Sequence, residues 1–157
     1  MPIRKKSDPQ ARILDAAENA FANDGFEGAA LRHIVKEAKV NLPTVYYYFK
    51  SKEGLLLAVM DRRFGPVRAE SFQLLKKFET EFKGRPLALE HILEAMIAPP
   101  LHLATDKSPN SAVTMRLLGR IVTDPHIQTQ KSVRCGHDEL REAFLAALHR
   151  ALPKLSM

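Results

Sequence analysis

The sequence predicts an all-α protein in which an N-terminal three-helix domain with a helix-turn-helix precedes a second helical domain. Three observations carry this prediction. Apolar residues recur at three- and four-residue spacing along most of the 157-residue chain. Cap residues followed by proline open several of these segments, and no strand-like alternation is found. We place the first domain at residues 1–52 and the second at 53–157.

The first helix is expected to begin at Asp8-Pro9, because aspartate caps a helix N-terminus and proline fits its first turn. Asp24-Gly25 is expected to end it. Its buried stripe is formed by apolar residues at helical spacing, namely Ile13, Leu14, Ala17, Ala20 and Phe21.

Two short helices with a tight turn are predicted between residues 31 and 49. The apolar face of the earlier helix is formed by Leu31, Ile34, Val35 and Ala38. Asn41 is a good N-cap for the later helix, and Pro43 follows in its first turn. Val45 and Phe49, four residues apart, supply the inward face of that helix.

The residues left on the outer face of the later helix are Leu42, Pro43, Thr44, Tyr46, Tyr47 and Tyr48. Three exposed tyrosines are costly for a soluble monomer and indicate a surface that meets a partner. Two helices arranged in this way can hold one helix in the major groove of DNA. The net charge of +6 and the sequence pI of about 9.6 suit an anionic partner.

The later part of the chain is also expected to be helical. Ser51 is predicted to cap a fourth helix, which we expect to kink near Gly65-Pro66. A fifth helix is predicted from Leu87 to about Ala98, closed by Pro99-Pro100. Two more are predicted over 112–122 and 138–152, and Asp124-Pro125 has the signature of a further helix start.

Residues Val40 to Leu55 resemble the recognition region of the TetR family of transcriptional regulators, with the pattern Val40, Tyr46, Phe49, Lys52 and Leu55 in order. Upstream, RILDAAENAFANDGFEGAALRHIVKEA is similar to the first two helices of that family. Two positions depart from the pattern. Lys39 stands where the family usually has a turn glycine, so the turn must tolerate a side chain. Ala30 stands where a phosphate-binding Thr or Ser is common, so we expect that contact to be lost.

The resemblance implies a role for each matched position. We expect Thr44 and Tyr46 to reach base edges, with Leu42 and Pro43 in apolar contact with thymine methyl groups. The expected phosphate contacts come from Arg32, Tyr47, Tyr48 and Lys52. Arg32 is also expected to be within reach of a base.

The second half of the chain resembles the C-terminal domain of the PsrA-type branch, in which fatty-acyl ligands occur. This implies an apolar small-molecule effector and a homodimer. Family members normally continue with two more helices that build the dimer interface, and this sequence stops at Met157, before them. The candidate effector-pocket residues are Met60, Phe64, Met96, Met115 and Phe144. Methionines and aromatics at helical spacing are more often ordinary core residues than ligand contacts.

Other classes of function find little support in the sequence. The scattered histidines have no metal-ligand spacing, and no catalytic constellation appears, so we expect no metal, no cofactor and no enzymatic activity. Cys135 is the single cysteine, which fits a reducing compartment. No apolar run is long enough to span a bilayer and no signal peptide is recognisable, so a cytoplasmic protein is expected. The alternative reading is a helical protein–protein adaptor that uses the tyrosine surface.

Overall fold

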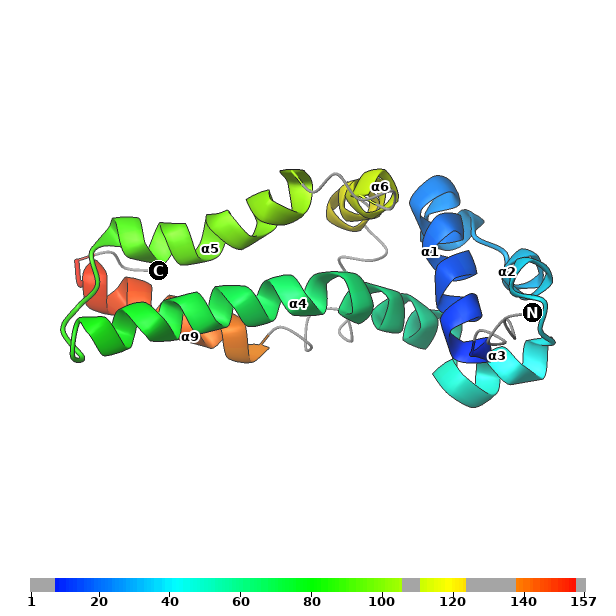
Figure 1. The fold of residues 1–157 in the computed structure, drawn as a ribbon, viewed down its shortest axis with the longest axis horizontal. Coiled ribbons are helices and arrows are strands. Elements are labelled where there is room, and N and C mark those ends of the chain that lie inside the picture. Colours follow the sequence, from blue (N-terminus) through cyan, green and yellow to red (C-terminus); the bar gives the residue numbers. More distant parts are fainter. Residues whose placement is uncertain (1–7, 106–110, 124–137, 155–157) are drawn as a thin grey trace, which may run out of the picture. The chain divides into compact units, whose positions relative to one another are not determined.

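The computed structural model describes residues 8–105, 111–123 and 138–154, and all regular secondary structure in these ranges is α-helical (Figure 1). This confirms the predicted fold class. Cys135 and Asp124-Pro125 lie outside the described residues. The helices are α1 (Pro9–Gly28), α2 (Leu31–Ala38), α3 (Leu42–Phe49), α4 (Lys52–Glu81), α5 (Leu89–Thr105), α6 (Ser111–Thr123) and α9 (Asp138–Ala151).

The chain divides into two compact units. Unit 1 comprises residues 1–62 and 112–130, and unit 2 comprises residues 63–111 and 131–157. Unit 1 therefore holds α1 to α3, the beginning of α4 and almost all of α6, whereas unit 2 holds the rest of α4 with α5 and α9. None of the helices in the described residues is long and apolar enough to cross a membrane.

Helix α1 begins and packs as predicted. The Asp8 carboxylate accepts a hydrogen bond from the backbone N–H of Gln10 at 3.2 Å. The predicted stripe is buried throughout. Gly25 has φ 74° and ψ −178°, a conformation outside the helical region that a glycine adopts easily. The regular helix is thus interrupted where Asp24-Gly25 predicts, and a last turn continues to Gly28.

The predicted helix-turn-helix is confirmed, with α2 and α3 packed beside α1 (Figure 1). Lys39 ends α2 in the left-handed conformation, with φ 53° and ψ 47°. A side chain is therefore tolerated at the position where the resemblance places glycine. The Asn41 side chain caps α3 by accepting a hydrogen bond from the N–H of Thr44 at 3.0 Å. Val45 and Phe49 face inward, with exposed fractions of 1 % and 6 %.

Two residues separate the end of α3 from the start of α4. The Ser51 hydroxyl accepts a hydrogen bond from the N–H of Gly54 at 3.0 Å, which confirms the predicted cap. A hydrogen bond from Ser51 is the main cause that lowers the pKa of the Glu53 carboxyl below its ordinary value. A negative charge in the first turn favours the helix. Each of these contacts helps to fix where α4 begins.

The sequence predicted a kink near Gly65-Pro66 and a helix end at Pro99-Pro100. Helix α4 continues through Pro66 as one helical element up to Glu81, and the kink itself stays a prediction. The prediction that Pro99-Pro100 closes the fifth helix is wrong, because α5 runs on to Thr105 and also begins later than predicted, at Leu89. Proline removes backbone hydrogen bonds, but its fixed φ is close to the helical value. Pro99 is buried, so its packing offsets part of this cost.

Unit 2 has its own apolar core, formed by Leu75, Phe78, Leu87, Ile92, Ala95, Phe144 and Ala147. These residues come from α4, α5, α9 and the segment before α5. At the rim of this core, Arg150 of α9 donates a hydrogen bond to Glu79 of α4. The predicted helices over 112–122 and 138–152 are confirmed as α6 and α9 to within a residue.

Candidate nucleic-acid interface

Helix α3 presents a row of tyrosines on the face opposite to its buried residues. The exposed fractions of Tyr46, Tyr47 and Tyr48 are 45 %, 72 % and 37 %. The rings of Tyr47 and Tyr48 meet edge to face, with centroids 5.1 Å apart. This edge-to-face contact restricts the rotation of both side chains.

The first turn of α3 combines an exposed Pro43 with half-buried Leu42 and Thr44. The Thr44 hydroxyl donates a hydrogen bond to the Asn41 side chain. The donor capacity of Thr44 is therefore used inside the turn, while its oxygen keeps lone pairs for an external donor. Of the residues predicted to face outward, Pro43 and the three tyrosines are exposed, whereas Leu42 and Thr44 are half-buried.

Lys50 belongs to the same surface and was not among the residues selected from the sequence. It follows α3 with φ 66°, in a region that side chains rarely adopt. Its ammonium group donates a hydrogen bond to the carbonyl of Tyr47 at 3.1 Å and lies 5.9 Å from the centre of the Tyr47 ring. The sequence signal that could have revealed it is the lysine directly after the tyrosine run.

Arg32 and Lys52 stand at two helix N-termini in unit 1. Arg32 is exposed in the first turn of α2, whose N-cap Ala30 makes no side-chain hydrogen bond. The Lys52 ammonium donates a hydrogen bond to the carbonyl of Glu27 at 3.2 Å and lies 4.8 Å from the centre of the Phe26 ring. Lys52 therefore connects the start of α4 to the end of α1, a role that the sequence alone does not reveal.

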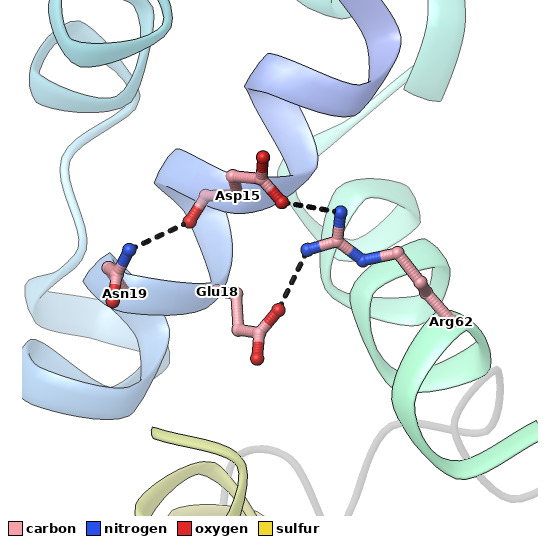
Figure 2. A network of polar contacts seen from close by, with 4 residues as sticks. All are labelled: Asp15, Glu18, Asn19 and Arg62. Carbon is pink, nitrogen blue, oxygen red and sulfur yellow. Dashed lines mark hydrogen bonds and ion pairs between the residues drawn. The ribbon is translucent and has the colours of Figure 1, made fainter. Parts of the chain in front are cut away.

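A partly buried ionic contact fastens α4 to α1. Figure 2 shows the Arg62 guanidinium between two carboxylates of α1. It lies 2.8 Å from an oxygen of Asp15 and 2.7 Å from an oxygen of Glu18. The Glu18 side chain is only 3 % exposed, whereas that of Asp15 is 67 % exposed. Burying a carboxylate costs free energy unless a charged group pairs with it, and the Arg62 guanidinium pairs with Glu18.

Helix α6 is also held to the end of α1 inside unit 1. Arg120 donates a hydrogen bond to the carbonyl of Asn23 at 2.9 Å. Thr114 and Leu117, on the same helix, are buried. The three-helix domain is therefore supported by the beginning of α4 and by α6.

The candidate effector residues are divided between the two units. Met60 is buried and Met115 is half-buried in unit 1. Phe64, Met96 and Phe144 belong to unit 2. Within unit 2, Met96 and Phe144 line one apolar cavity of about 390 Å³. The assignment of the five residues to an effector pocket stays a prediction.

Two family models match the chain. The model described as bacterial regulatory proteins of the tetR family matches residues 13–59, which include α2, α3 and the start of α4. The model described as the tetracyclin repressor-like C-terminal domain matches residues 94–157. The chain belongs to the TetR family. The helix-turn-helix described above is thus the characteristic N-terminal part of a TetR-family chain.

Several curated proteins are similar to this TetR-family chain. The fatty acid metabolism regulator protein of Bacillus subtilis is 28 % identical over 90 residues, which are 57 % of this chain and 43 % of that protein. The A-factor receptor protein of Streptomyces griseus is 40 % identical over 58 residues, or 37 % of this chain and 21 % of the relative. The transcriptional repressor NemR of Escherichia coli is 30 % identical over 81 residues, which are 52 % of this chain and 41 % of that protein.

These matches span less than half the length of each of the three relatives. Among solved structures, that of a HlyIIR mutant protein aligns with 98 % of this chain and 90 % of its own chain. Its sequence identity is 21 % and its TM-score is 0.35.

Proposed function

We propose that this chain is a sequence-specific DNA-binding transcriptional regulator that acts in the cytoplasm, where its DNA target lies. The observation that carries the proposal is the outer face of α3. Val45 and Phe49 anchor one side of this helix in the domain, while Tyr46 and Tyr47 stand exposed on the other. A short helix held in this way by a preceding helix and a tight turn fits the major groove.

The proposed contacts follow from the position of each side chain. Thr44 and Tyr46 read base edges from the exposed face of α3, and Leu42 and Pro43 meet thymine methyl groups. Arg32, Tyr47, Tyr48 and Lys52 contact the phosphate backbone. Because its ammonium group is held by the Glu27 carbonyl, Lys52 supplies charge from a fixed position.

Lys50 joins this set as a further phosphate contact. Its ammonium group is exposed beside the Tyr47 ring, so both groups can approach the same strand of DNA.

We further propose a repressor that a small molecule releases from a palindromic operator. Two copies must place their recognition helices about 34 Å apart, one turn of DNA, to bind successive major grooves. An effector that favours a different spacing lowers affinity for the operator by shifting a two-state equilibrium. The effector is proposed to be apolar, which includes fatty-acyl-like molecules. The similarity to a fatty acid metabolism regulator supports this choice.

The experiment that tests DNA binding is a salt titration with random duplex DNA. A DNA-binding surface gives a log–log slope of about −0.9 for each phosphate contacted, so affinity falls steeply as salt rises. Selection from a random DNA pool then yields the operator. The protein–protein adaptor remains the second candidate, supported by the tyrosine surface. DNA binding that is absent or insensitive to salt would favour it.

A further inference from the structure

The Asn41 side chain makes two contacts with Thr44 at the start of α3. Its amide oxygen accepts a hydrogen bond from the backbone N–H of Thr44 at 3.0 Å and a second one from the Thr44 hydroxyl. The same backbone nitrogen also lies 3.2 Å from the Asn41 carbonyl oxygen. The residue that precedes the helix therefore holds both the backbone and the side chain of Thr44.

The direction of both side-chain hydrogen bonds follows from the chemistry of the groups. A backbone N–H can only donate, so the Asn41 amide turns its oxygen, and not its amino group, toward Thr44. An amide oxygen can only accept, so the Thr44 hydroxyl that contacts it donates its single proton. The hydroxyl oxygen then has only lone pairs left for a group outside the protein. In this arrangement Thr44 is an acceptor and not a donor.

Thr44 stands where such an acceptor can meet a base. It is half-buried in the first turn of α3, between exposed Pro43 and buried Val45. Adenine and cytosine each present an amino group in the major groove, whereas guanine and thymine present carbonyl oxygens. Every base pair therefore carries this amino group on one strand only. An acceptor at a fixed position distinguishes the strand that carries it.

We propose that Asn41 is a positioning residue through which Thr44 selects an amino base, adenine or cytosine, over a keto base, guanine or thymine, in the operator. The proposal rests on the proposed function, because it requires α3 to lie in the major groove. A keto base at this position opposes its own oxygen to that of Thr44. To donate to the keto base, Thr44 must release the Asn41 amide and lose that hydrogen bond. Asn41 is exposed, so water replaces part of the lost bond and the selectivity is moderate.

Selection of operators from a random DNA pool, with the wild type and with Thr44→Val, locates the base pair concerned. The preference at that pair should disappear in the variant, because valine has the shape of threonine without the hydroxyl. A Thr44→Val chain that selects the same operator as the wild type would overturn the proposal.

Base analogues then test the direction of the hydrogen bond. In one half-site the amino base is replaced by the analogue that lacks only the amino group, which is unsubstituted purine for adenine or pyrimidinone for cytosine. The loss of affinity should be about fivefold larger for the wild type than for Thr44→Val, as expected for one neutral hydrogen bond. The control removes the carbonyl oxygen of the paired keto base and should weaken both proteins alike. The reverse pattern would show that Thr44 donates, and would overturn the proposal.

Asn41 variants test the positioning role. Asn41→Gly removes the acceptor at a helix cap where glycine is tolerated better than alanine. The Thr44 hydroxyl can then donate as well as accept, so the penalty for reversing the base pair should fall about fivefold. Asn41→Asp keeps an acceptor oxygen and should keep the full penalty, although its negative charge lowers affinity for all DNA. A merely structural role predicts that Asn41→Gly weakens every operator alike with the penalty intact, and this result would contradict the proposal.

Salt titration with random duplex DNA separates this proposal from the proposed function. Steep salt dependence, together with equal responses of the wild type and Thr44→Val to loss of the amino group, would retain the DNA-binding regulator and reject the role of Asn41. Absence of salt-dependent DNA binding would reject the regulator itself.

Discussion

The carbonyl oxygen of Phe49 occupies the space that a side chain at Gly54 would need. A Cβ atom at Gly54 would lie 2.1 Å from this oxygen, well inside van der Waals contact. The same oxygen accepts a hydrogen bond from the N–H of Ser51 at 2.8 Å. The end of α3 and the start of α4 are therefore fixed to each other through backbone atoms.

Gly54→Ala is expected to lower the free energy of unfolding by about 2–3 kcal/mol, because the backbone must move to admit the methyl group. Thermal unfolding measures this loss. The control is Gly119→Ala in α6, where nothing lies within 4 Å of the added Cβ atom. Gly119→Ala should raise the free energy of unfolding by up to about 1 kcal/mol, because alanine has the higher helix propensity. Equal effects at the two sites would contradict the close approach of the Phe49 carbonyl oxygen to Gly54.

Lys39→Gly is expected to stabilise unit 1 by about 1 kcal/mol. Lys39 has φ 53°, and left-handed backbone costs a residue with a side chain roughly 1–2 kcal/mol. Lys36→Gly is the matched control, since Lys36 is exposed in the last turn of α2 and its replacement by glycine should cost up to about 1 kcal/mol of stability. Chemical denaturation of both variants gives the comparison. Destabilisation by Lys39→Gly would show that its side chain makes a contact that outweighs the strain.

Local rules allowed the fold of unit 1 to be predicted closely. Asn41 and Ser51 are caps because their side chains suit that role in any sequence, and the spacing of Val45 and Phe49 defines a face without knowledge of its neighbours. The extent of α5 could not be predicted in this way. Its continuation past Pro99 depends on burial, which is a tertiary property.

Arg62→Met is expected to destabilise unit 1 by about 3 kcal/mol. The change leaves the carboxylate of Glu18, whose side chain is 3 % exposed, without the guanidinium that lies 2.7 Å away. Breaking a buried pair from one side is strongly destabilising. The control is Asp15→Asn, because the Asp15 side chain is 67 % exposed and its pair should contribute less than about 1 kcal/mol. Chemical denaturation should separate the two variants, and similar losses would contradict a special role for Glu18.

The stability of unit 2 should depend on pH through Glu79. Hydrogen bonds from Lys76 and then Arg150 lower the pKa of this carboxyl below its ordinary value of 4.5. A lowered pKa stabilises the folded state above the unfolded value, and this contribution is lost as the pH falls through the folded value. Glu79→Gln should therefore cost at most about 1 kcal/mol at neutral pH, since both cations are exposed.

At a pH below the folded pKa of Glu79, its carboxyl is protonated. The wild type and Glu79→Gln should then have about the same free energy of unfolding. Glu81→Gln is the control, because Glu81 is exposed and its contact with Lys77 is longer, at 3.8 Å. Unfolding curves recorded across the acidic range measure the difference. A Glu79→Gln effect that stays constant with pH would show that packing, and not charge, is responsible.

The candidate interface was predicted from the sequence only in part. The outward tyrosines follow from helical periodicity, and their exposure agrees with that pattern. The fixed position of Lys52 above Phe26 joins residues far apart in sequence, so no local pattern reveals it. The same holds for Arg62 and Glu18, whose ion pair joins α4 to α1.

The most direct test of the central claim compares operator and random DNA for two changes in α3. Tyr46→Phe and Thr44→Val remove hydroxyl groups from the proposed base-reading face, and each lost contact should cost about 1–3 kcal/mol of discrimination. Tyr47→Phe serves as the control and should weaken both DNAs alike, since its proposed contact is to phosphate. The account predicts that the first two variants lose at least about tenfold in operator affinity while binding to random DNA stays nearly unchanged. An equal loss on the two DNAs would contradict the claim that α3 reads sequence.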